Sequence, residues 1–158
     1  MKQITSILLF IFALNISAQE TTFNKFYKKH KDQSAFSMNL SGSFAGSFLD
    51  DDDDKELKDF LKKSGDFKLM VFNNEDSEVS KDFKRYVRKN NLKTMARVKE
   101  KDGRVAFYIL RKRDRVKEIV LRANSKEDKL VLFGIKTDMT MDELADMMSD
   151  SNLKITAD

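Results

Sequence analysis

The sequence predicts a single α+β domain in which about four amphipathic helices cover an antiparallel sheet. Three observations predict this class. Apolar residues recur at helical spacing in four separate segments, and four strand-like runs follow one another closely between residues 92 and 136. The chain also shows no internal repeat and no linker toward a second domain. We therefore expect a four-strand meander, joined by one or two further strands, at the centre of the fold.

The first 18 residues, MKQITSILLFIFALNISA, have the pattern of a secretory signal peptide. Lys2 provides a basic start, an apolar run extends from Ile4 to Leu14, and small residues precede a cut after Ala18. The run is shorter than the roughly 20 residues that span a bilayer. We expect residues 19–158 to form one exported domain, in the periplasm or outside the cell, without a transmembrane segment.

The absence of cysteine excludes disulfides, thiolate metal sites and a cysteine nucleophile. It also excludes a lipid on an N-terminal cysteine, so we do not expect a lipoprotein. The chain has 30 basic and 26 acidic residues, a formal net charge of +4 and a pI near 9.1. Because this excess is small and exported proteins rarely meet nucleic acid, the expected partner is an envelope protein or an anionic glycolipid or polysaccharide.

The mature chain begins with a predicted helix of about ten residues from Thr22. Its apolar face consists of Phe23, Phe26, Tyr27 and His30. Residues 36–40 then alternate apolar and polar side chains, which predicts a short strand. The next segment, SGSFAGSFL at 41–49, is typical either of a helix face or of a loop rich in small residues, and its glycines favour neither.

Five consecutive aspartates precede the second predicted helix: Asp50, Asp51, Asp52, Asp53 and Asp54. Leu57, Phe60 and Leu61 follow at helical spacing, so the acids lie at a helix start, where negative charge caps the free N–H groups. A calcium loop needs Gly at position six and Glu at position twelve, and no register of the run supplies them. We interpret the run as a solvated capping cluster. A divalent-cation site stays open as the alternative.

A buried strand and a third helix follow. The run FKLMVF at 67–72 is almost wholly apolar, which is typical of a strand buried on both faces. The third helix places Val79, Phe83, Tyr86 and Val87 on one face and is expected to end at Asn90–Asn91.

The meander is read from four runs: LKTMARVK, RVAFYILRK, RVKEIVLRA and KLVLFGIK. Asp102–Gly103, between the first two, is a strong hairpin signal. The final helix begins with a capping box of Thr140 and Glu143. Met139 and Leu144 stand where a hydrophobic staple would pack, and we expect Leu144, Met147 and Met148 to fill core space.

Motifs for catalysis are missing from the sequence. His30 is the one histidine, and its place on an apolar helix face favours a structural role. There is no phosphate-binding Gly loop, nucleophile elbow or metalloprotease helix, so we expect no cofactor and no enzymatic activity. An enzyme of unrecognised type that uses carboxylates stays open as the alternative, because any two of the 26 acids could meet in space.

A basic stretch surrounds the predicted turn after residue 110, with Arg111, Lys112, Arg113, Arg115 and Lys117. Charged turns commonly keep a sheet edge soluble. The sharper hypothesis is a patch that binds an anionic lipid, a polysaccharide or an acidic protein face.

The whole mature chain resembles a known family. The segments FNKFYKKHKD, FKLMVF, FKRYVRKN and LVLFGIKTDMTMDELADM, together with the acidic run, look like the domain of unknown function 4252 family of small exported proteins, chiefly from Bacteroidetes. The resemblance implies an α+β domain in the cell envelope with no established activity and no catalytic residues to carry over. Many relatives are lipoproteins, which this chain cannot match without cysteine.

The same resemblance implies a link to envelope stress response, because such families neighbour sigma and anti-sigma factor genes. Our leading hypothesis is a non-enzymatic binding or interaction module of the cell envelope. A purely structural or storage role is the third class, after the enzyme alternative.

Overall fold

The structure is a computed structural model, and it describes residues 22–42, 44, 64–73, 78–100, 103–125 and 128–150. Within these ranges lie three α-helices, one short 3₁₀ helix and six strands. In chain order they are α2 (Thr22–His30), the 3₁₀ helix η1 (Lys31–Gln33), β1 (Phe36–Ser41), β2 (Asp66–Phe72), α5 (Glu78–Lys89), β3 (Lys93–Glu100), β4 (Gly103–Lys112), β5 (Arg115–Ser125), β6 (Leu130–Thr140) and α6 (Met141–Asp150).

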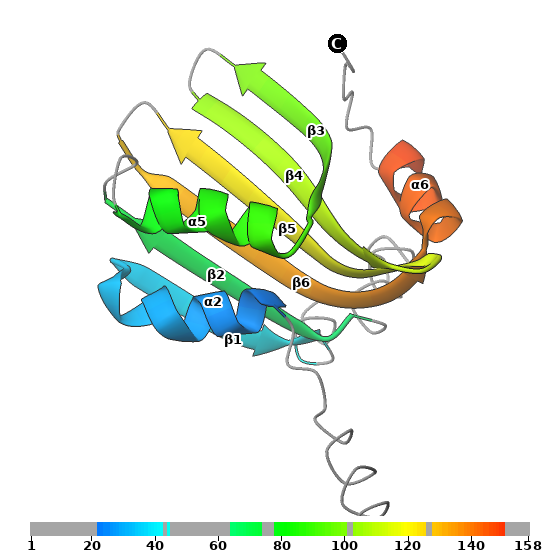
Figure 1. Ribbon diagram of the computed structural model, residues 1–158, viewed down its shortest axis with the longest axis horizontal. Helices are drawn as coiled ribbons and strands as arrows, with labels where there is room; N and C mark the ends of the chain where they lie inside the picture. The colour runs from blue at the N-terminus through cyan, green and yellow to red at the C-terminus, as the bar shows by residue number, and fades with distance from the viewer. Residues whose placement is uncertain are drawn as a thin grey trace, which may run out of the picture.

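All six strands form one antiparallel sheet in the order β1-β2-β6-β5-β4-β3 (Figure 1). Strands β3, β4, β5 and β6 are neighbours in chain order, and Lys112 pairs with Arg115 across the turn between β4 and β5. On its other side β6 pairs with β2, where Phe133 lies opposite Leu69. The predicted α+β class with an antiparallel sheet is confirmed.

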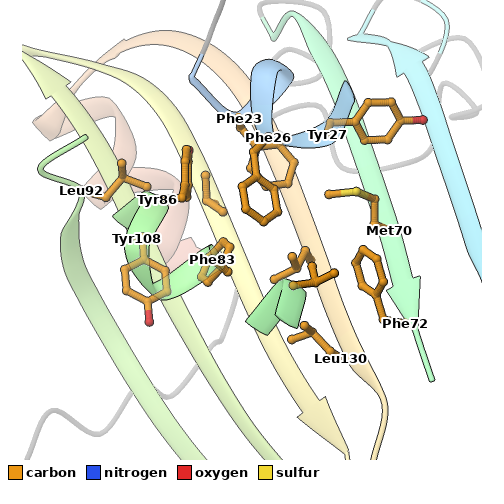
Figure 2. Packing of buried hydrophobic residues seen from close by; sticks show 13 residues of the cluster. Phe23, Phe26, Tyr27, Met70, Phe72, Phe83, Tyr86, Leu92, Tyr108 and Leu130 are labelled. Atoms are coloured by element: carbon orange, nitrogen blue, oxygen red, sulfur yellow. The ribbon is translucent and has the colours of Figure 1, made fainter. Parts of the chain in front are cut away.

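Helices α2 and α5 cover one face of this sheet, and Figure 1 shows α2 in front of β2 and α5 in front of β5 and β6. The main core lies between them and the strands. Aromatic rings fill much of it: Phe26 meets Phe83 edge to face at 5.8 Å and Tyr86 at 5.2 Å between ring centroids. Figure 2 shows these rings beside Met70, Phe72 and Leu130 from the strands.

Helix α5 forms where the sequence predicts it, with Val79, Phe83 and Tyr86 buried. Asn91 ends the helix in the left-handed region, with φ 54°. The N–H of Asn91 donates to the carbonyl of Arg88, and the N–H of Leu92 donates to the carbonyl of Val87. This pair of bonds is the Schellman pattern that satisfies the last carbonyls of a helix. The predicted stop at Asn90–Asn91 is confirmed.

Helix α6 begins with the predicted capping box. The N–H of Thr140 donates to Glu143 Oε2 at 2.8 Å, and the N–H of Glu143 donates to Thr140 Oγ1 at 3.2 Å. Leu144 packs with Ile109 and Val116 in a second, smaller core. Because Ile109 alternates with Tyr108 of the main core along β4, the two cores lie on opposite faces of the sheet.

Two details of the prediction need correction. The described residues hold three α-helices and not about four, and the helix expected at Leu57–Leu61 lies outside them. The last meander strand was expected to end at residue 136, but β6 continues to Thr140 because it keeps pairing with β5 beyond an irregularity between Val116 and Glu118. The predicted signal peptide, the segment 45–49 and the aspartate run also lie outside the described residues.

Candidate anion-binding site

A hollow of about 550 Å³ is lined by residues of α5, β3, β4 and β5. Among the described residues that line it, five side chains are cationic and none is a carboxylate. We call it the basic hollow and define it by Lys84 on α5, Arg97 and Lys99 on β3, Arg104 on β4, and Arg122 and Asn124 on β5. Alternation along the strands places these β residues on the same face as Tyr108 and Val120 of the main core.

Strand register places like charges directly opposite each other in the basic hollow. Lys99 pairs with Arg104, and in the next row Ala106 pairs with Arg97 on one side and Arg122 on the other. Directly paired residues have Cβ atoms about 4.5–5.5 Å apart, and like charges at that separation destabilise a sheet. An anion bound between them would remove the repulsion. The short side chain of Ala106 leaves room for it.

The floor of the basic hollow holds buried polar groups. Asn124 is 9% exposed, and its Nδ2 has no hydrogen-bond partner among the described residues. Such a buried donor typically costs about 1–3 kcal/mol. Arg122 is fixed against α5, where its Nη2 donates to Ser80 Oγ at 2.9 Å. The Tyr108 ring packs edge-on against Phe83 at 5.8 Å (Figure 2). The Asn124 amide is thus a candidate donor for a bound oxyanion.

A second hollow of about 380 Å³ lies between α2 and α5. Phe26 and Tyr86 of the main core form part of its wall. We call it the interhelical groove and define it by Lys25, Lys29 and His30 on α2 and Asp82, Arg85 and Lys89 on α5. In the part of its lining that the structure describes, four lysine or arginine side chains therefore stand against one carboxylate.

The carboxylate in the described lining of the interhelical groove is already engaged. Asp82 lies 2.7 Å from Lys29 Nζ and 2.8 Å from Arg85 Nη1, and the hydrogen bond from Lys29 holds the pKa of Asp82 below its usual value. His30 Nε2 is 3.5 Å from Asp82 Oδ2, but burial, followed by the charge of Lys29, lowers the pKa of His30. At neutral pH the groove is therefore positive without a contribution from His30.

The sequence-predicted patch of Arg111, Lys112, Arg113, Arg115 and Lys117 lies around the turn between β4 and β5. Asp138 on β6 engages two of these side chains: Arg115 Nε and Lys117 Nζ each lie 2.6 Å from Asp138 Oδ1. Arg115 Nη2 also donates to the backbone oxygen of Asp138. Hydrogen bonds from Lys117 and Arg115 lower the pKa of Asp138, and Asp138 raises the pKa of Arg115.

Two of the five predicted cations thus take part in a contact between strands. The patch is also distant from the basic hollow. Arg104 and Lys112 are eight residues apart on β4, which corresponds to about 27 Å along an antiparallel strand. The structure therefore does not bring the predicted patch and the basic hollow together.

Two further candidates from the sequence are His30 and the aspartate run. His30 is 3% exposed and packs against Phe26 with ring centroids 4.4 Å apart, as expected of a structural histidine. The candidate cation ligands Asp50–Asp54 lie outside the described residues. Within the residues that the structure does describe, no three His, Asp or Glu side chains gather as metal ligands would.

No helix in the described part of the chain has the length and apolar character needed to cross a membrane.

Sequence reasoning missed the basic hollow because its cations come from four separate elements. The signal that could have found it is the alternation of basic residues along two neighbouring strands: Arg97 and Lys99 on one, and Arg104 next to the hairpin on the other. With the Asp102–Gly103 hairpin as a guide to register, these three residues fall on one face.

The fold and the two hollows together define the class of protein: a small α+β domain whose helix-covered sheet face carries concave, basic surfaces. The sequence model described as Domain of unknown function (DUF4252) matches residues 23–147. The chain belongs to this family, as its segments led us to expect. Searches of curated proteins and of solved structures gave no match.

Proposed function

We propose that this protein is a non-enzymatic binding module of the cell envelope and that its ligand is an anionic polymer held in the basic hollow. The observation that carries the proposal is the pairing of Lys99 with Arg104 in a concavity whose described lining has five cations and no carboxylate. A protein that retains like charges at a paired position loses stability unless a ligand of opposite charge occupies the site.

The envelope location rests on the signal-peptide pattern of residues 1–18. There the available polyanions are anionic polysaccharides and glycolipids. The described residues that line the basic hollow include no histidine and no carboxylate, the side chains that most often act as general acid or base, and we propose binding without a catalytic step. The link to envelope stress response comes from the family resemblance. In that response, binding of the anionic polymer in the basic hollow would be the signal.

The test is titration of the mature chain, residues 19–158, with a fluorescein-labelled sulfated oligosaccharide, followed by fluorescence anisotropy at low and high salt. We expect binding that weakens steeply with salt, because charged contacts dominate. The double variant Arg97→Glu/Arg104→Glu should weaken binding by roughly tenfold or more. The matched control, Arg111→Glu/Arg113→Glu, changes the net charge equally at the distant turn and should have little effect.

Two outcomes would contradict the proposal. Loss of binding in the turn variant alone would assign the ligand to the sequence-predicted patch. A stoichiometric protein partner that survives high salt in a pull-down from envelope extract, and that binds the Arg97→Glu/Arg104→Glu variant unchanged, would assign the protein to protein–protein recognition elsewhere on its surface.

A further inference from the structure

Helix α5 separates the two basic concavities and contributes to both. Lys84 lines the basic hollow, and the next residue, Arg85, lines the interhelical groove. Consecutive helical residues point about 100° apart around the axis, so these two side chains diverge to opposite flanks of α5. The helix is therefore a ridge with a positively charged concavity on each side.

The crest of this ridge is also basic. At 3.6 residues per turn, Lys81 and Arg88 project roughly 60° and 40° around the helix from Lys84, in the direction of Arg85. All four side chains are exposed. They form one stripe at spacings of three and four residues, with no acidic residue between Lys84 and Arg85 on that arc. The stripe connects the basic hollow to the interhelical groove.

Such a stripe is unfavourable for the helix by itself. Like charges three or four residues apart destabilise a helix by a few tenths of a kcal/mol per pair. Lys81 with Arg85, and Lys84 with Arg88, are two such pairs at a spacing of four. A ligand that carries negative charge along its length would convert these repulsions into attractions.

We propose that the basic hollow, the crest of α5 and the interhelical groove form one continuous site for a linear anionic polysaccharide that crosses α5. The inference rests on the proposed function and specifies its ligand: a chain long enough to pass over a helix, with sulfate, phosphate or carboxylate groups along its length. A helix with its side chains is about 10–12 Å across, so a short oligosaccharide would fill one concavity only.

The shape of the surface favours a flexible chain over a membrane. The two concavities recede on either side of the crest, so a flat bilayer would meet the crest of α5 while the hollow and the groove remained unfilled. A linear polymer follows both slopes and satisfies both sets of cations.

The nature of the walls favours a polysaccharide over single-stranded nucleic acid. Proteins that bind single strands combine a basic groove with aromatic platforms on which bases stack. The aromatic residues beside the interhelical groove, Phe26 and Tyr86, are each 7% exposed because they pack into the main core. They offer no open face for stacking.

The experiment is a length series of sulfated oligosaccharides, from disaccharide to dodecasaccharide, titrated into the mature chain at constant salt. For the unaltered protein we expect affinity to rise with length and then level off once the chain spans both concavities. The crossing variant, Lys81→Glu/Arg88→Glu, changes residues that line neither concavity. It should weaken binding of the longest probe roughly tenfold and leave the shortest within about twofold.

The crossing variant is expected to fold, because each new glutamate lies four residues from Lys84 or Arg85 and forms a favourable pair on the helix. Circular dichroism would check this. A groove variant, Lys25→Glu/Lys89→Glu, should reproduce the length-dependent loss. The turn variant Arg111→Glu/Arg113→Glu, with the same change in net charge, should bind every probe normally.

The results separate this inference from the proposed function. If the hollow variant Arg97→Glu/Arg104→Glu loses all probes while the crossing and groove variants keep the longest one, the hollow binds anions but the continuous site is wrong. If the hollow variant also binds normally, the proposed function fails as well. Tighter binding of phosphatidylglycerol vesicles, or of an oligonucleotide of equal charge, than of the longest oligosaccharide would overturn the assignment to a polysaccharide.

Discussion

Glu118 on β5 caps the first turn of α2 at Thr22, a residue 96 positions away in the sequence. Its Oε1 accepts a hydrogen bond from the N–H of Thr22 at 2.5 Å, and its Oε2 accepts one from the N–H of Phe23 at 3.1 Å. Glu118 is 2% exposed, and the Tyr86 hydroxyl lies 3.3 Å from Oε2. Burial, together with this neighbouring carboxylate, raises the pKa of Tyr86. A helix of nine residues with no acid in its first turn depends on such support from the sheet.

Replacing Glu118 should therefore destabilise the fold strongly. We expect Glu118→Gln to lower the free energy of unfolding by about 1–3 kcal/mol, because the amide keeps only one of the two acceptor oxygens. Glu118→Leu should lower it by at least about 3 kcal/mol, because both N–H groups of α2 lose their acceptor in a buried site. Urea unfolding followed by circular dichroism measures both. Asp32→Asn, at an exposed position, is the control and should change stability by less than about 0.5 kcal/mol. Equal effects at the two positions would contradict the capping role.

Gly134 on β6 provides the space into which Phe23 of α2 packs. A Cβ atom at this position would lie 2.6 Å from the ring Cγ of Phe23 and closer still to the ring edge. We expect Gly134→Ala to lower the free energy of unfolding by about 1–3 kcal/mol through overpacking. Gly65→Ala is the control, because the nearest atom there, Lys136 Cδ at 3.0 Å, belongs to a flexible side chain.

The cause of the Gly134 effect can be checked with a double-mutant cycle. In a Phe23→Leu background the added methyl group meets a smaller side chain, so Gly134→Ala should be less harmful there than in the unaltered protein. Strict additivity of the two substitutions would show that the ring contact is not the cause.

His30 should make stability depend on pH in the mildly acidic range. Its ring is 3% exposed, both ring nitrogens lack hydrogen-bond partners in the described part of the chain, and burial lowers its pKa from 6.5. The unfolded chain then binds the proton more readily than the folded one, so the contribution to stability is complete above about pH 6.5 and is lost as the pH falls. We expect His30→Phe to be the more stable form near pH 5 and to show a flatter profile.

The measurement is the urea midpoint of both proteins between about pH 8 and pH 5. Asp82, whose pKa is lowered, stays ionised through this range and so does not produce the same slope. Identical profiles for the two proteins would exclude His30 as the origin of the pH dependence.

Lys99→Glu should increase stability and decrease ligand binding at the same time. The substitution turns the like-charge pair with Arg104 into a pair of opposite charges on neighbouring strands, which typically gains about 0.2–1 kcal/mol. The same change removes a cation from the basic hollow, and affinity for a sulfated oligosaccharide should fall. Thermal unfolding and anisotropy titration test the two effects separately. A loss of stability would show that the repulsion inferred from the register is absent.

Arg113 at the turn between β4 and β5 adopts φ 57°, a left-handed conformation that costs a non-glycine residue roughly 1–2 kcal/mol. Arg113→Gly removes that cost but adds flexibility to the unfolded chain, so we expect a net gain of about 0.5–1 kcal/mol. Thermal unfolding would show it as a rise in Tm. Leu110→Gly, within strand β4, is the contrasting variant and should lower Tm.

Local signals in the sequence identified much of the fold. The helix at Glu78–Lys89, its end at Asn91 and the capping box of Thr140 with Glu143 each depend on residues within about four positions of one another, and all three are confirmed. The family could also be recognised from its segments.

By itself the sequence determined most of the helices and strands that the structure describes, because periodicity and capping act between near neighbours in the chain. Only the tertiary structure decided that β6 lies between β2 and β5, that Glu118 caps α2, and that Lys99, Arg104 and Arg122 share one hollow while Asp138 engages Arg115. These relationships join residues that are distant in sequence, and they follow from strand register and from the burial of whole faces.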